Sequence, residues 1–194
     1  MRIQQALRKL RSNKVLGLNP TTGLYEDTLN PGVLEVSGHW ISERVSFNSR
    51  RVLLVEQPLS PTYSVLKLGD EPERHILYSG QKNIYHDTAA YYDYTLLDET
   101  DEASIIRQVT TISASGIQGS TVETTVDTLP VHLVRFGQTP SDEADFIFFS
   151  RQYAFLPAFA DITTADELQV GTDRFTIQDI AQELLTMRIT MVKR

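Results

Sequence analysis

Apolar residues occupy alternate positions in two segments near the end of the chain, residues 175–177 and 185–191. The alternating residues are Phe175 and Ile177 in the first segment, and Leu185, Met187, Ile189 and Met191 in the second. A period of two is typical of half-buried strands, and the intervening Gln178–Glu183 is short enough for a hairpin connection. Gly171-Thr172-Asp173, just before the first segment, has turn chemistry. These residues predict the last strands of a small β-barrel.

Short strand candidates, separated by turn signals rich in Gly, Pro and Asn, cover most of the remaining chain. They are residues 33–36, 39–46, 51–55, 64–68, 74–78, 91–97, 121–126, 131–136 and 146–150. One short segment, Leu66–Asp70, resembles Leu168–Asp173, either by chance or as a duplicated barrel strand. The predicted fold class is mainly β, a small antiparallel β-barrel or sandwich.

Two segments have helical spacing. Met1–Lys14 predicts an amphipathic helix, with Ile3, Leu7 and Leu10 on one face. Its charges are all positive: Arg2, Arg8, Lys9, Arg11 and Lys14. Residues 103–112 have apolar side chains every three residues after the acidic stretch 98–102, which favours a helix, although their β-branched residues favour a strand. Our interpretation of residues 103–112 leans to a helix.

This pattern predicts three parts along the chain. Residues 1–14 form a basic, amphipathic N-terminal helix, residues 15–98 a β-rich module or insertion, and residues 99–194 a C-terminal small β-barrel. The acidic run at 98–102 sets the boundary between the last two parts. A single domain over residues 15–194 is the alternative.

Composition narrows the class of protein. Apolar residues make up 41% and charged residues 22% of 194 residues, as in ordinary globular proteins. No cysteine is present, which excludes disulfides, thiol catalysis and Cys-ligated metals. The apolar runs are far shorter than the roughly 20 residues that span a bilayer, and residues 1–14 lack a secretory signal's apolar middle. We therefore expect synthesis in the cytoplasm and no membrane partner.

Charge is uneven. Residues 1–60 carry a net positive charge and residues 61–194 a net negative one, within an overall charge of −7. An acidic body argues against tightly bound nucleic acid, because phosphate contacts supply most of such affinity. It remains compatible with a surface that DNA slides past, since like charges repel.

No motif predicts catalysis or cofactor binding. The histidines, His39, His75, His86 and His132, each stand alone in the sequence, without the spacing of a helical metal site. A serine nucleophile elbow and a phosphate-binding loop are also missing from the sequence. We expect no catalytic residue, no metal and no cofactor, and hence no enzyme.

Three groups of residues are candidates for an interface. The first is the Tyr85–Tyr94 patch, with Tyr91, Tyr92 and Tyr94, which predicts a glycan or peptide platform, an ordinary strand or an oligomer interface. The second is Trp40, either core packing or an interface anchor. The third is the basic group Arg44, Arg50 and Arg51, either a solvated strand end or a contact with an acidic neighbouring subunit.

The C-terminal part resembles the head-closure (stopper or neck) proteins of tailed bacteriophages. The resemblance covers about residues 129–193: Leu129–Phe136 is similar to the strand that opens this part in the family, and Arg151–Pro157 to the lead into the last barrel strands. Asn19–Tyr25 also looks like the opening of some phage structural proteins. The chain departs from the family in its length, which leaves residues 15–128 without a counterpart.

This resemblance implies a non-catalytic β-barrel in the virion neck. Such proteins form rings of six or twelve copies between the portal or adaptor and the tail, and close or continue the DNA channel after packaging. DNA would pass through the lumen without sequence-specific binding. Two alternatives remain open: a tail terminator or other joining ring of the same virion, and a non-viral β-sandwich that binds a ligand through the Tyr85–Tyr94 patch.

Overall fold

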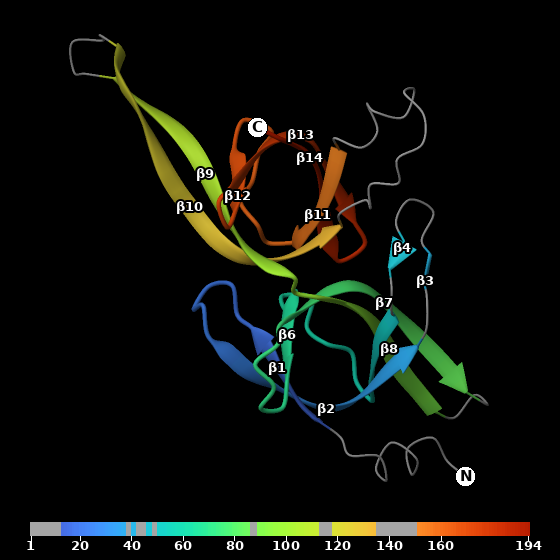
Figure 1. The fold of residues 1–194 in the computed structure, drawn as a ribbon. Helices are drawn as coiled ribbons and strands as arrows, with labels where there is room; N and C mark the ends of the chain where they lie inside the picture. The colour runs from blue at the N-terminus through green and yellow to red at the C-terminus, as the bar shows by residue number, and fades with distance from the viewer. Residues whose placement is uncertain are drawn as a thin grey trace, which may run out of the picture. The chain divides into compact units, whose positions relative to one another are not determined.

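A computed structural model describes residues 13–37, 40–41, 46–47, 50–85, 89–112, 118–134 and 151–194, and all its regular elements are strands. The strands are β1 (Asn13–Leu18), β2 (Tyr25–Ser37), β3 (Trp40–Ile41), β4 (Ser46–Phe47), β5 (Arg50–Val55), β6 (Val65–Leu68), β7 (His75–Tyr85), β8 (Ala89–Asp98), β9 (Asp101–Ile112), β10 (Gln118–Val134), β11 (Arg151–Pro157), β12 (Glu167–Val170), β13 (Asp173–Glu183) and β14 (Thr186–Lys193). The predicted mainly-β class is confirmed (Figure 1).

The first closed barrel has the strand order β1-β2-β5-β8-β7-β6, and β6 pairs back onto β1. Alternate residues of its strands fill the interior. The core includes the fully buried Val15, Leu53 and Leu66, with Leu77 and Leu96 packed beside them. A separate two-stranded sheet, β3-β4, lies between β2 and β5 in sequence.

The second closed barrel has the order β10-β11-β14-β13-β12-β9, and β12 pairs with β9 to close it. The alternation at the chain end marks its strands in part, since Phe175, Ile177, Ile189 and Met191 are buried. Met187 is only half-buried, and Leu185 precedes β14. The connection between these strands differs from the expected one. All of Gln178–Glu183 belongs to β13, and the turn is the short step before β14, where Leu184 adopts a φ of 50°.

The two barrels repeat one topology. Taking β1, β2, β5, β6, β7 and β8 as equivalent to β9 through β14 in order turns the first strand order into the second. The similar segments Leu66–Asp70 and Leu168–Asp173 contribute the equivalent strands β6 and β12. Each strand is followed by a glycine in the left-handed region, Gly69 at φ 60° and Gly171 at φ 58°. The structure therefore supports a duplicated barrel over a chance similarity.

Neither predicted helix is found among the described residues. Residues 103–112 belong to β9, not to a helix. Ala103 and Ile105 fill the barrel and Ile106 is also buried, so the three-residue spacing does not correspond to a helical face and the β-branched residues decide the conformation. The predicted helix Met1–Lys14 falls mostly outside the described residues, and its last two residues, Asn13 and Lys14, belong to β1.

The chain divides into two compact units. One comprises Met1–Glu99 with the short segments Pro157–Phe159 and Glu183–Thr186, as far as these are described. The other comprises Thr100–Leu156, Ala160–Gln182 and Met187–Arg194. Each unit contains one of the two barrels.

Gly80 in β7 is a sensitive point of the first barrel. A Cβ there would lie 2.5 Å from Cε1 of the Tyr94 ring and 2.8 Å from its Cδ1. This ring is buried, and its hydroxyl accepts a hydrogen bond from the Leu59 backbone N–H at 2.9 Å, so it cannot move aside freely. We expect Gly80→Ala to lower the free energy of unfolding by about 1–3 kcal/mol, measured by urea denaturation.

The same substitution made in a Tyr94→Leu background should cost much less, because the obstructing ring is gone. An equal loss in both backgrounds would show that the Tyr94 ring is not what excludes a side chain at Gly80.

Candidate assembly surface

The strands β9 and β10 continue past their barrel as a two-stranded ribbon (Figure 1). The pairing of β12 with β9 ends at Ile106, and β10 contacts β11 only from His132 onward. Beyond Ile106, β9 and β10 pair only with each other within the described chain. We call this ribbon the arm: residues 107–112 of β9 and 118–125 of β10.

Both faces of the arm are exposed. Val109 and Val122 are direct cross-strand partners on one face, and they are 45% and 51% exposed. Thr110 and Thr121 are partners on the other face, with their hydroxyl oxygens 3.2 Å apart. An isolated two-stranded ribbon gains little from its own contacts in water. Burial of the exposed valine pair against a partner would therefore stabilise the ribbon.

The arm carries no charge between Arg107 and Glu123. Residues 108–122 contain no Asp, Glu, Lys or Arg, in a chain that is 22% charged. Natural proteins protect exposed strand edges with charges, proline or a covering element, because unpaired edges otherwise join other chains. An uncharged ribbon rich in Thr, Val and Ser has the chemistry of a surface that is covered in an assembly.

A bulge marks the root of the arm. Thr125 pairs with Ile106, but Asp127 pairs with Ile105, so Val126 is an extra residue with no partner on β9. Bulges bend a strand and increase its local twist. This bulge stands where β9 leaves β12 and so redirects the ribbon as it leaves the barrel.

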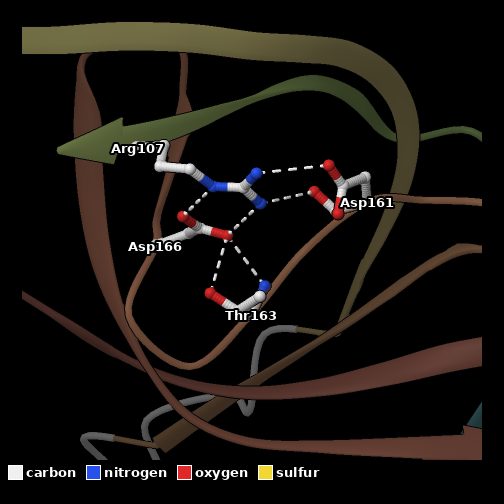
Figure 2. Close-up of polar contacts among 4 residues, drawn as sticks. All are labelled: Arg107, Asp161, Thr163 and Asp166. Carbon is white, nitrogen blue, oxygen red and sulfur yellow. Dashed lines mark hydrogen bonds and ion pairs between the residues drawn. The ribbon is translucent and has the colours of Figure 1, made fainter. Parts of the chain in front are cut away.

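An ion-pair network fixes the β9 side of the root (Figure 2). The Arg107 guanidinium donates from Nε to Asp166 Oδ1 at 2.8 Å and from Nη2 to Asp166 Oδ2 at 2.9 Å. It also bonds the Asp161 carboxylate and backbone carbonyl, each at 3.2 Å. Thr163 donates to Asp166 Oδ2 from its backbone N–H at 2.8 Å and from its hydroxyl at 3.0 Å.

The network has clear electrostatic consequences. The Asp166 side chain is only 1% exposed, so its charge depends on these partners. The Arg107 guanidinium, and then the Thr163 donors, hold the pKa of the Asp166 carboxyl below its usual range against the opposing effect of burial. The result is a rigid link between the arm and the loop that leads into β12.

A second ion pair fixes the β10 side. Arg174 of β13 donates from Nη1 and Nη2 to the two carboxylate oxygens of Glu123, at 3.0 Å each. This pairing lowers the pKa of the Glu123 carboxyl. Glu123 is the cross-strand partner of Gln108, one step before the Val109–Val122 pair. The ion pairs thus fix the ribbon as far as the Gln108–Glu123 pair, and the rest of the arm projects beyond that pair.

The equivalent hairpin of the first barrel, β1-β2, has no such extension. It closes directly after Leu18, where the Asn19 side chain accepts a bond from the Thr21 N–H at 2.9 Å and the Gly23 N–H bonds the Asn19 carbonyl at 2.8 Å. At this equivalent position, the first barrel therefore has a short hairpin turn and the second barrel has the arm. Barrel closure alone does not require an extended ribbon at this position.

The sequence-predicted interface residues do not gather into one described site. Arg2, Arg8, Lys9, Arg11 and Arg44 lie outside the described residues. Lys14 in β1 pairs with Asp27 at 3.0 Å. Trp40 belongs to β3, opposite Phe47, and Arg50 and Arg51 begin β5.

The three tyrosines of the predicted patch lie on β8 in different environments. Tyr94 is part of the first barrel's core, with its hydroxyl bonded to Leu59, whereas Tyr91 and Tyr92 are half-buried. Tyr92 and Tyr94 line a cavity of about 370 Å³ beside the Pro58–Ser64 loop, and Tyr91 does not. The patch is therefore divided between core packing and a cavity wall, not displayed as one aromatic platform.

Comparison of the chain with protein-family models, curated proteins and solved structures yields no match. In the parts of the chain that the structure describes, no helix has the length and apolar character needed to cross a bilayer. Function is therefore inferred from the geometry of the described residues.

The arm is the feature that the sequence interpretation missed. Assigning residues 103–112 to a helix hid their pairing with β10. The uncharged stretch 108–122, with β-branched residues on both sides of Gly116 and Gly119, was the available signal for a hairpin. The Arg107–Asp166 pairing had no comparable sequence signal, because its partners are far apart along the chain.

Proposed function

We propose that this chain is a structural subunit that assembles with copies of itself into a ring, and that the arm forms the contact between neighbouring copies. The observation that carries this proposal is the uncharged, two-sided exposure of the arm beyond its fixed root. The partner that covers the arm is a second copy of this chain. Enzymatic activity forms no part of this role.

A ring follows from the kind of contact that an arm makes. When a projecting element of one subunit binds a different surface on the next, the interface is heterologous, and repetition closes into a ring if the rotation allows it. A rigid root favours closure, because every copy then presents its arm at the same angle. The Arg107–Asp166 pair, whose carboxylate is buried, supplies most of that rigidity, and the more exposed Arg174–Glu123 pair adds to it.

The particular assembly that we propose is the neck of a tailed-phage virion, where the ring joins portal or adaptor to tail and closes or continues the DNA channel. Its support is the sequence resemblance over residues 129–193, most of which belong to the second barrel. The acidic net charge of −7 is compatible with a lumen that DNA passes without sticking. A tail terminator or another joining ring would use the same arm and the same ring geometry.

The valine face of the arm provides the test. Val109→Asp together with Val122→Asp places two charges on an exposed face, so both barrels should remain folded. Burying those charges against a neighbouring copy is costly, so we expect association to weaken by about tenfold or more. Mass photometry over a concentration series measures the association, and circular dichroism checks the fold.

The matched control carries the same charges on the opposite face, as Thr110→Asp with Thr121→Asp. Association of this control should stay close to that of the unchanged chain. If both double variants lost association equally, the valine face would not be the contact. If both variants associated as well as the unchanged chain, the arm itself would not be the contact.

The ligand-binding alternative rests on the cavity beside Tyr92. Its wall includes Tyr94, whose hydroxyl is already bonded to Leu59, so the aromatic groups there serve the barrel core as well. The arm has no such second role, which is why the assembly function is preferred.

A further inference from the structure

A second cluster of polar residues lies in the first barrel. It consists of Glu71, Glu73 and His75, at the start of β7 and in the turn before it. One carboxylate oxygen of each glutamate and a ring nitrogen of His75 lie within 4.8 Å of one another.

His75 is the unusual member. Its side chain is fully buried, and its Nδ1 lies 3.0 Å from Oδ1 of Asp98, its cross-strand partner on β8. Its Nε2 is also buried and has no hydrogen-bond partner among the described residues. Buried polar atoms are almost always satisfied, so a buried nitrogen without a partner, on a histidine whose ring lies near two carboxylates, calls for an explanation.

Asp98 supplies one. A carboxylate that accepts an Nδ1–H bond selects the imidazole tautomer whose lone pair is on Nε2, which is the tautomer that binds metals through this atom. Histidine ligands in metal sites commonly have such a carboxylate behind them, where it fixes the ring and increases its basicity. The remaining ligands, two exposed glutamates on a turn, can adjust their side chains to complete the coordination.

We propose that His75 Nε2, Glu71 and Glu73 bind a divalent transition-metal ion, with Asp98 as the positioning residue behind the histidine. Imidazole and carboxylate ligands without cysteine suit Zn²⁺, with water completing a tetrahedral shell. The bound ion would fasten the turn at residues 69–74 to the end of the first barrel. The site is structural and independent of the arm.

Titration of the chelator-treated full chain with ZnCl₂ tests this site. We expect one ion bound per chain by calorimetry and an unfolding temperature that rises with zinc, since a ligand of the folded state stabilises it. Glu71→Gln with Glu73→Gln should remove the binding, and circular dichroism checks that this variant, whose two altered side chains are exposed, keeps the fold. Asp70→Asn, in the same turn but outside the cluster, should bind as the unchanged chain does.

Asp98→Asn separates positioning from direct ligation, and should weaken zinc affinity by about 10–100-fold while the glutamates remain in place. A direct readout comes from Co²⁺, whose visible absorption reports nitrogen and oxygen coordination, and this spectrum should disappear in the double glutamate variant. Absence of zinc binding in the unchanged chain would overturn the proposal. Binding that is equally strong in the double glutamate variant and in Asp70→Asn would overturn it too.

Discussion

Shortening the arm is expected to abolish assembly while leaving two folded barrels. In this variant the two residues Asn-Gly replace residues 109–122, so that a two-residue turn connects Gln108 to Glu123. Gln108 and Glu123 are cross-strand partners, so a two-residue turn of the hairpin type fits between them. We expect association to weaken by about a hundredfold or more, or about 3 kcal/mol, because the whole proposed contact is removed.

The design keeps both fixed points of the root. Arg107 retains Asp166, and Glu123 retains Arg174, so the second barrel should unfold at nearly the same temperature as in the full chain. Mass photometry measures the association and calorimetry the unfolding. A shortened variant that assembles as well as the full chain would rule the arm out as the contact between copies.

Asp166→Ala is expected to have the largest effect on stability. The change removes a buried carboxylate that accepts four hydrogen bonds from Arg107 and Thr163, and leaves those donors without their charged partner. Hydrogen bonds to charged groups are among the stronger ones in proteins. We therefore expect the free energy of unfolding to fall by about 2–3 kcal/mol, measured by chemical denaturation.

Asp161→Ala is the matched control, since Asp161 bonds the same guanidinium but its side chain is 73% exposed. Its loss should change stability far less, because an exposed ion pair is weakened by water and salt. Equal effects of the two substitutions would contradict a dominant role for the buried carboxylate.

The same network predicts a pH dependence. The folded-state pKa of Asp166 is lowered, so its ionised form stabilises the fold at and above neutral pH. That stabilisation is lost as the pH falls below about 4 and through the lowered pKa, where folded protein must also take up the proton. The difference in stability between the unchanged chain and Asp166→Ala should therefore shrink in acid. A difference that stays constant down to acid unfolding would contradict this assignment.

The class of fold could be predicted from local patterns, and its organisation only in part. The alternation of Phe175 with Ile177, and of Ile189 with Met191, marks half-buried strands without further information. The similarity of Leu66–Asp70 to Leu168–Asp173 leaves both chance and a duplicated strand open, and only the repeated topology favours duplication. Barrel closure through the β1-β6 and β9-β12 pairings depends on contacts between distant segments, which no local pattern specifies.

The arm was harder to predict because two local signals disagreed. Acidic residues before Ala103 and apolar residues every three positions favoured a helix, while the β-branched residues favoured a strand. Pairing with β10 decided the outcome, and it is a tertiary effect that overrides propensity. The His75 cluster was hidden for another reason, since its histidine stands alone in the sequence and acquires Asp98 only through the pairing of β7 with β8.

The most direct test of a ring built through the arm is negative-stain imaging of the purified chain beside its arm-shortened variant at equal concentration. We expect closed rings with a central channel for the full chain, and single two-barrel particles for the shortened one. Identical particles in the two samples, whether single or assembled, would contradict this expectation.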